Sequence, residues 1–261
     1  MTNRAWCRAR AGWGVVALGL LLPGCEAEEA GPGALVARSI AVHGGAVFEE
    51  SEVRFRFREA DFRVVRDGGR FVYERTLVDE EGQSVREGMD NDSTWRVVDG
   101  AAEVLDRDAR EAVETRVNSV VYFGFLPFRL DDPAVRVRAL PDGEVAGEPY
   151  RRVEVTFEEA GGGQDWEDRF VYWFHPEHHT LDFLAYRYYR DEGGTRFRRA
   201  VNRREIEGIL VQDYENYAPL VEVDDIAEFG LVYARGELAL VSLVELEEVE
   251  VRPLQQPPDE D

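Results

Sequence analysis

Strict alternation of apolar and charged residues is the feature that most constrains the fold of this chain. In the segment Val53-Arg54-Phe55-Arg56-Phe57-Arg58, every second side chain is apolar and the others are arginines. Because successive side chains of a strand point to opposite faces, this pattern predicts a strand with one buried and one solvated face. Similar segments recur along the chain between glycine-bearing turns such as Asp67-Gly68-Gly69. We therefore expect a mainly β protein.

The other predicted strands fall into two series on either side of one long helical segment. The segment from Asp108 to Tyr122 starts polar, becomes apolar and runs on to Phe128, and a first helix is predicted at Ala34–His43. We expect a single large curved antiparallel sheet, an unclosed half-barrel, with an N-terminal helix and a covering helical segment. The predicted strands are Phe62–Arg66, Phe71–Val78, Ser84–Met89, Thr94–Val98, Val135–Leu140, Tyr150–Phe157, Trp166–Phe174, Leu181–Arg190, Arg196–Arg204, Ile209–Tyr217 and Leu238–Val251.

The start of the chain has the features of a secretory signal. Arginines precede a short apolar run that ends in Leu22-Pro23-Gly24-Cys25. This ending resembles the lipobox of bacterial lipoproteins, which implies cleavage before Cys25 and attachment of lipid to its sulfur. An ordinary signal peptide with an incidental cysteine is the alternative. We expect a signal at 1–24, a lipidated tether at 25–33, one domain at 34–252 and a disordered acidic tail at 253–261.

Composition excludes several functions. The chain contains no lysine, so enzymes that need a lysine Schiff base or a phosphate-binding lysine are excluded. Its formal net charge of −22 disfavours nucleic acid as a partner. Cys7 would leave with the signal and Cys25 would carry lipid, which leaves no cysteine for a disulfide. No cofactor is expected.

Several segments together resemble an uncharacterised bacterial envelope family, domain of unknown function 6503. They are Ile40–Gly45, Asn118–Phe123, Leu126–Phe128, Asp132–Val135, Gly161–Asp168 with Tyr172-Trp173, and Arg196–Ala200. By analogy, the family looks like the periplasmic lipoprotein-carrier superfamily. That resemblance implies a half-barrel whose open side is closed by helices and whose apolar concavity holds acyl chains. It also implies a location in the cell envelope, facing the periplasm.

Aromatic residues at alternate strand positions provide a candidate site. Stacked on one face of the sheet and covered by Val120–Phe128, they would line a pocket for an acyl chain or a similar apolar ligand. Ordinary core packing is the alternative interpretation. The proposed ligand contacts are Phe55, Phe57, Tyr73, Trp95, Phe123, Phe125, Tyr172, Phe183 and Tyr186.

Two polar clusters point less clearly to chemistry. Three histidines at 175, 178 and 179 could bind zinc, but Pro176 favours a hairpin turn in which they face water, so we expect no metal site. The remaining histidine, His43, is expected to end a helix over the core. Asp165, Glu167 and Asp168 resemble the acidic sites of glycoside hydrolases. On a strand, however, Asp165 and Glu167 would share one face and Asp168 the other, so we expect no catalytic residues.

Three interpretations follow from the sequence. The first is a membrane-anchored protein that binds or carries a hydrophobic ligand such as a lipid or a lipoprotein acyl chain. The second is a non-catalytic envelope module whose concave sheet docks a partner protein. The third is a hydrolase that uses histidine or carboxylates. A filled core under the sheet would favour the second, and a ligand in a cavity would favour the first.

Overall fold

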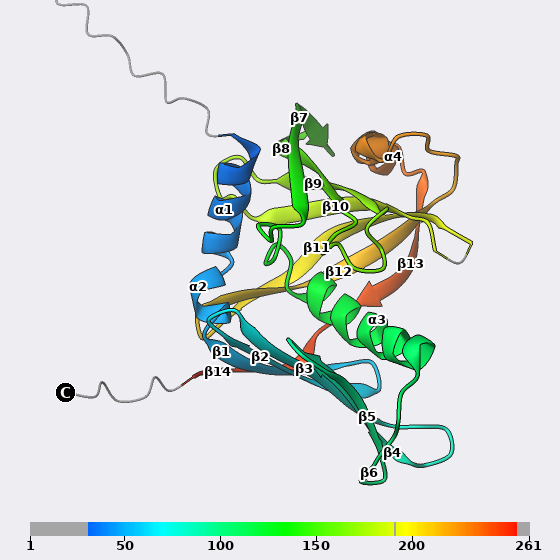
Figure 1. The fold of residues 1–261 in the computed structure, drawn as a ribbon. Helices are drawn as coiled ribbons and strands as arrows, with labels where there is room; N and C mark the ends of the chain where they lie inside the picture. Colours follow the sequence, from blue (N-terminus) through cyan, green and yellow to red (C-terminus); the bar gives the residue numbers. More distant parts are fainter. Residues whose placement is uncertain (1–30, 191, 255–261) are drawn as a thin grey trace, which may run out of the picture. The chain divides into compact units, whose positions relative to one another are not determined.

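Two seven-stranded antiparallel sheets dominate the computed structural model, which describes residues 31–190 and 192–254 (Figure 1). The first sheet has the order β14-β1-β2-β3-β4-β5-β6 and the second β13-β12-β11-β10-β9-β8-β7. The first contains β1 (Ser51–Phe57), β2 (Ala60–Asp67), β3 (Arg70–Val78), β4 (Ser84–Asp90), β5 (Thr94–Val98), β6 (Ala101–Ala102) and β14 (Glu247–Pro253). The second contains β7 (Val135–Val145), β8 (Glu148–Phe157), β9 (Arg169–Phe174), β10 (Leu181–Tyr188), β11 (Gly194–Ile206), β12 (Ile209–Pro219) and β13 (Leu238–Val244).

Helices lie at the start of the described chain, between the two series of strands and before β13. They are α1 (Pro32–Val42), α2 (Gly45–Phe48), α3 (Arg107–Gly124), a 3-10 turn (Ile226–Glu228) and α4 (Phe229–Ala234). Helix α3 connects the last strand of the first series to β7 and contacts strands of both sheets (Figure 1). Among the described residues, no helix is long and apolar enough to cross a membrane.

The predicted architecture is confirmed: the protein is mainly β, antiparallel and open, with an N-terminal helix and a covering helix. The strands form two hydrogen-bonded sheets where one was expected, because the chain leaves the first sheet for α3 and starts a new sheet at β7. The signal, Cys25, the tether as far as residue 30 and the tail from residue 255 lie outside the described residues.

The last strand segment joins the two sheets. The sequence predicts one strand at Leu238–Val251, whereas the structure has β13 paired with β12 and β14 paired with β1. At the break, the N–H of Leu246 donates to Asp213 at 3.0 Å, and Arg204 donates to the carbonyl of Leu246. Arg204 also pairs with the buried Asp213 carboxylate at 3.0 Å. These side chains satisfy backbone groups that no strand pairs at this point.

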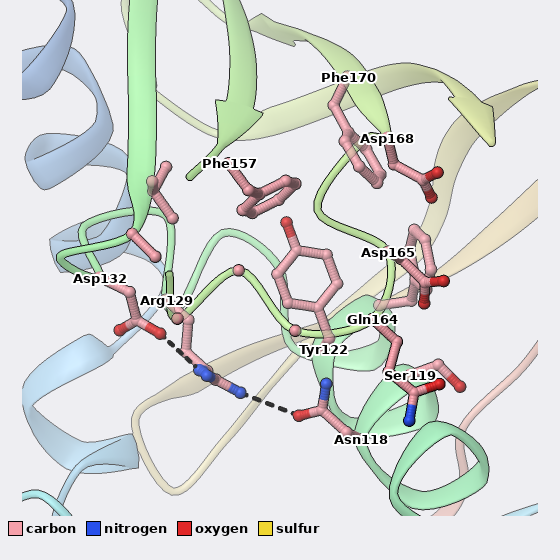
Figure 2. Close-up of a pocket in the computed structure, with 16 residues that line it drawn as sticks. Asn118, Ser119, Tyr122, Arg129, Asp132, Phe157, Gln164, Asp165, Asp168 and Phe170 are labelled. Carbon is pink, nitrogen blue, oxygen red and sulfur yellow. Dashed lines mark hydrogen bonds and ion pairs between the residues drawn. The ribbon is translucent and has the colours of Figure 1, made fainter. Parts of the chain in front are cut away.

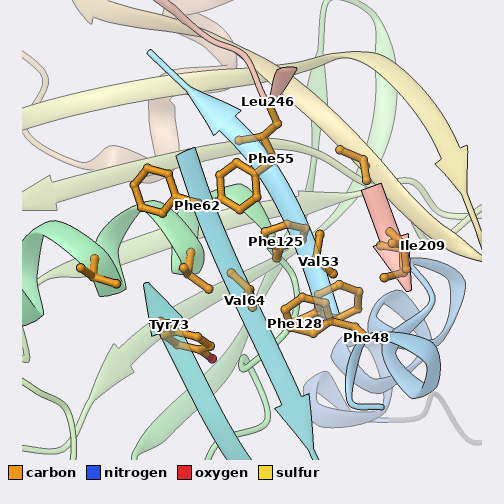
Figure 3. Packing of buried hydrophobic residues seen from close by; sticks show 14 of the residues in the cluster. Phe48, Val53, Phe55, Phe62, Val64, Tyr73, Phe125, Phe128, Ile209 and Leu246 are labelled. Atoms are coloured by element: carbon orange, nitrogen blue, oxygen red, sulfur yellow. The ribbon is translucent and has the colours of Figure 1, made fainter. Parts of the chain in front are cut away.

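Aromatic side chains fill the space under the first sheet (Figure 3). Phe48 of α2 stacks on Phe125 and Phe128, which follow α3, at centroid distances of 5.0 and 4.5 Å. Phe55 of β1 contacts Phe125 edge-on at 5.4 Å. Ile209, at the start of β12 in the second sheet, joins this cluster. Side chains from both sheets therefore meet in this cluster.

His43 connects α1 to the second sheet. It caps the C-terminus of α1, as expected, and is fully buried. Its Nε2 accepts the N–H of Leu181 at 3.2 Å, and its carbonyl accepts the N–H of Leu210 at 3.0 Å. Burial, assisted by the charge of Arg203, lowers the pKa of the imidazole to about 3. The side chain is therefore neutral and structural.

Glu87 connects α3 to the first sheet. The carboxylate lies on β4 with 1% of its side chain exposed and pairs with Arg75, Arg96 and Arg116 at 2.6–2.7 Å. Burial raises the pKa of Glu87, but hydrogen bonds from Arg116 and Arg96 and the charge of Arg75 outweigh it and lower the pKa to about 2. Since Arg116 belongs to α3, this buried cluster holds the helix against the sheet.

We predict that stability depends on the protonation of His43. Below pH 6.5 the unfolded chain takes up a proton on this imidazole, whereas the folded protein does so only near pH 3. The stability advantage of wild type over His43→Gln should therefore shrink as the pH falls from 6.5 toward 4, by up to roughly 1.4 kcal/mol per pH unit. Urea unfolding of both proteins across this range measures the difference. If the difference in unfolding free energy between wild type and His43→Gln stays constant with pH, His43 has the same pKa in the folded and unfolded protein.

We also predict that Glu87→Gln lowers the free energy of unfolding at pH 7 by about 3 kcal/mol, because three arginines lose their buried partner. In wild type, this contribution is lost as the pH falls from 4.5 toward 2. The matched control is Glu158→Gln, which breaks a pair with Arg136 that is about half exposed on both sides. The control should cost less than about 1 kcal/mol. Equal losses in the two variants, measured by urea unfolding, would contradict this role for Glu87.

Candidate functional site

The nine aromatic residues expected to line one cavity pack into separate clusters. Phe183 lies on the outer side of the second sheet with residues of α4, because α4 covers that face. Trp95 packs on Gly88 of β4 so closely that a Cβ there would lie 2.4 Å from the indole. The others divide between two buried clusters: Phe55, Tyr73 and Phe125 in the first, Tyr172, Tyr186 and Phe123 in the second, and Phe57 against both. Their role as ligand contacts stays a prediction.

A pocket of about 140 Å³ opens beside α3 (Figure 2). The C-terminal half of α3 forms one wall, the segment leading into β7 forms another, and the connection from β8 to β9 forms the third. Of the nine predicted residues, Phe123 is in its lining. The lining residues are Asn118, Ser119, Tyr122, Phe123, Arg129, Asp132, Ala134, Val135, Phe157, Gly161, Gly162, Gly163, Gln164, Asp165, Asp168 and Phe170.

Aromatic rings make the apolar part of the pocket. Phe157 meets Phe170 edge-on at 5.7 Å, and Phe123 lies 6.0 Å from Phe170. The Tyr122 ring points toward Phe157 at 6.4 Å (Figure 2). The hydroxyls of Tyr122 and Tyr172 are hydrogen-bonded to each other at 3.2 Å. Burial raises the pKa of both phenols. Both tyrosines therefore stay neutral, and the back of the pocket is uncharged.

A fixed arginine lies at one side of the pocket. The Arg129 guanidinium donates to the Asn118 amide oxygen at 3.0 Å and to the Asp132 carboxylate at 2.8 Å (Figure 2). Asn118 belongs to α3, while Arg129 and Asp132 belong to the segment before β7. The hydrogen bond to Asn118 therefore ties that segment to the helix, and the ion pair with Asp132 places a cation with a neutralising partner at the pocket.

Acidic residues occupy the opposite side. Burial, together with the negative charge of Asp165, raises the pKa of Asp168 to about 6. Asp168 accepts the N–H of Tyr189 at 3.3 Å, and Asp165 pairs with Arg190 at 3.2 Å. The expectation that Asp168 points away from Asp165 is wrong, because 165–168 form a turn and β9 starts only at Arg169. Glu167 is absent from the lining.

The glycine run at 161–163 forms the third wall. Gly161 and Gly163 have φ of +91° and +75°, which a residue with a side chain adopts only with strain. A Cβ at Gly162 would lie 2.2 Å from the carbonyl oxygen of Glu158 and 2.8 Å from the Cβ of Trp166. The backbone angles and the close contacts at Gly162 make this segment a turn that forms one wall of the pocket.

The histidine cluster lies in the turn between β9 and β10. His175 Nδ1 accepts the N–H groups of Glu177 and His178 at 3.2 and 3.1 Å, and the rings of His175 and His178 stack at 4.4 Å. His175 therefore uses one ring nitrogen to hold the turn. Across residues 31–190 and 192–254, no group of three His, Cys, Asp or Glu side chains is arranged to hold a metal ion.

Polar pocket residues such as Asn118, Arg129 and Gln164 were missing from the predicted ligand contacts. Gln164 accepts from Thr115 at 3.3 Å and from Arg190. The signal that could have found this site was the set of motifs carrying the family resemblance. Three of those motif segments, Asn118–Phe123, Asp132–Val135 and Gly161–Asp168, meet around this pocket.

We predict that Asp168→Asn stabilises the protein at pH 7.5. A raised pKa means that the folded state prefers the protonated form of Asp168, and this preference is lost as the pH rises through about 6. The amide oxygen of Asn can still accept the N–H of Tyr189. The stabilisation should fade as the pH falls from about 6 to 3.8, and urea unfolding at pH 7.5 and below pH 3.8 measures it. Equal stability of the two proteins at pH 7.5 would contradict the burial of this charge.

Comparison with known proteins gives one family and several solved structures of limited similarity. A family protein (DUF1329) from Desulfovibrio piger ATCC 29098 is 12% identical over 85% of this chain and 93% of its own, with a TM-score of 0.48. A putative outer membrane lipoprotein-sorting protein domain from Vibrio parahaemolyticus is 11% identical over 69% and 84%, with a TM-score of 0.38. Mycobacterium tuberculosis lipoprotein LppX is 14% identical over 59% and 87%, with a TM-score of 0.27. No curated protein matches. The model of the family of unknown function DUF6503 matches residues 15–246, and the chain therefore belongs to that family.

Proposed function

We propose that this protein binds a hydrophobic ligand whose apolar end enters the pocket beside α3. The proposal rests on three segments of the chain that meet at one pocket. Segments at Asn118–Phe123, Asp132–Val135 and Gly161–Asp168 are distant in sequence, carry the family resemblance and meet at this one pocket. Segments that meet around an opening in the packing, rather than inside a filled core, favour a binding role.

The size and chemistry of the pocket limit the ligand. Its volume of about 140 Å³ is close to that of an apolar cavity, ~150 Å³, which is known to accept benzene. It suits a small ring or the end of an acyl chain, and the rest of a lipid would lie outside. The rim offers the Arg129–Asp132 pair on one side and Asp168 on the other. A ligand with a polar head next to its apolar end fits this arrangement.

The lipid anchor belongs to the same proposal. Attachment of lipid at Cys25 would hold the protein on a membrane of the cell envelope, facing the periplasm, without a membrane-spanning helix. An anchored binding protein with a pocket for the end of an acyl chain suits the handling of lipids or lipoproteins. Mass spectrometry of Cys25 in the native host tests this part independently of the pocket.

The packing argues against docking of a partner inside the concave first sheet. Phe48, Phe125 and Phe128 already stack there, and each is at most 4% exposed. A partner would have to displace three buried rings. A filled core is the sign that favours the partner-docking alternative over a cavity under this sheet, so that alternative stands with its docking surface outside this face.

The test is a substitution that fills the pocket. We expect Ala134→Phe to reduce binding of a fluorescent fatty acid at least about tenfold, equivalent to 1.4 kcal/mol, because the new ring occupies the apolar space. Ala139→Phe is the matched control, since Ala139 lies on β7 but is exposed. Both variants start at Glu26, and circular dichroism verifies that they fold.

Native mass spectrometry of the same protein, with organic extraction, identifies any ligand that co-purifies. A stoichiometric acyl ligand in wild type and Ala139→Phe, lost in Ala134→Phe, is the expected result. Equal binding by the two variants would contradict the position of the site. A clean apo mass, with no uptake of offered lipids, would contradict the proposed function itself.

A further inference from the structure

Strand β13 is an exposed apolar edge. It ends the second sheet and pairs with β12 on one side, and no strand within the described residues pairs with its other side. Leu240, Val241 and Leu243 are 53%, 51% and 49% exposed. Its register with β12 places Leu240 opposite Tyr217 and Leu243 opposite Glu215, so both leucines share one face of the sheet. Unpaired backbone groups next to exposed apolar side chains form a template for another strand.

The other three sheet edges carry features that discourage such pairing. Strand β6 has only two residues. Strand β7 alternates arginines with apolar residues and contains Pro141, and β14 carries several glutamates and ends at Pro253. Charges, prolines and short length are the usual protections of an edge. The sequence of β13, LALVSLV, has none of these three, and its one irregularity is a register shift against β12 at Val241. This contrast within one molecule distinguishes β13 from an incidental edge.

We propose that β13 docks an extended apolar segment of a partner protein, which adds as an eighth strand to the second sheet and carries basic residues at its ends. Backbone hydrogen bonds along the free edge supply affinity, and alternate side chains of the added strand cover Leu240 and Leu243. The basic ends follow from the flanks of β13. Glu245, directly after the strand, is exposed, and Glu237, directly before it, is half-buried and lies 4.0 Å from Arg235.

Charge argues against a second copy of this chain as the occupant. Antiparallel self-pairing centred on Val241 would place Glu237 opposite Glu245 of the other copy at both ends of the strand. Like charges directly opposite each other destabilise a strand pair. Each copy also carries a formal net charge of −22. The terminal sequences of this chain are equally unsuitable, since EAEEA at 26–30 and QQPPDED at 255–261 are acidic.

The experiment uses the chain from Glu26 and two labelled nine-residue peptides. Both have a core of alternating valine and threonine, flanked by two arginines at each end in one and by two glutamates in the other. We expect the arginine peptide to bind at least tenfold more tightly in fluorescence anisotropy. Its binding should slow amide hydrogen exchange along Leu238–Val244, which a loose electrostatic contact would not do.

Substitutions locate the site and test the charge rule. Leu240→Lys with Leu243→Lys should abolish binding, whereas Val78→Lys, at a 64% exposed strand position of the first sheet, should leave it unchanged. Glu237→Arg with Glu245→Arg should reverse the preference toward the glutamate peptide. Ala134→Phe should bind the arginine peptide like wild type, which separates this site from the pocket.

Two outcomes would overturn the proposal. The first is arginine-peptide binding without protection of the β13 amides, or with equal affinity in the double lysine variant. The second is a dimer in analytical ultracentrifugation that the double lysine variant dissociates, because the occupant would then be a second copy of this chain.

Discussion

The ion pair between Arg204 and Asp213 holds the position at which the chain passes from one sheet to the other. Asp213 accepts the N–H of Leu246, and Arg204 donates to the carbonyl of the same residue. A buried backbone group left without a partner costs about 1–3 kcal/mol, so this crossing would be unfavourable without them. This connection lies between the pairing of β13 with β12 and that of β14 with β1, and Leu246 itself belongs to the buried cluster under the first sheet.

Most elements of the fold could be predicted from the sequence, because alternation reports directly which side of a strand is buried. In β1, Val53 and Phe55 are buried, whereas Arg54 and Arg56 are exposed. The break after β13 could not be predicted in this way. The segment around Leu246 keeps its β pattern, and the break is imposed by side chains from β11 and β12, which no local pattern reveals.

The candidate site was less predictable for a related reason. Alternation tells which residues are buried but not which of two covered faces they occupy, so Phe183 was grouped with residues on the opposite side of its sheet. The pocket also takes much of its lining from a turn, where strand geometry does not apply. Asp165 and Asp168 meet there because the chain turns, whereas a strand would have separated them.

The pairing of β1 with β14 has a consequence for how the protein is made. Ser51 lies opposite Pro253, so the first strand of the chain finds its partner some two hundred residues later. Contacts between such distant residues slow folding, because a long loop must close before they form. The first sheet cannot be completed until β14 is available to pair with β1. Until then, the edge of β1 that faces away from β2 is unpaired, and another strand or a chaperone can bind to it.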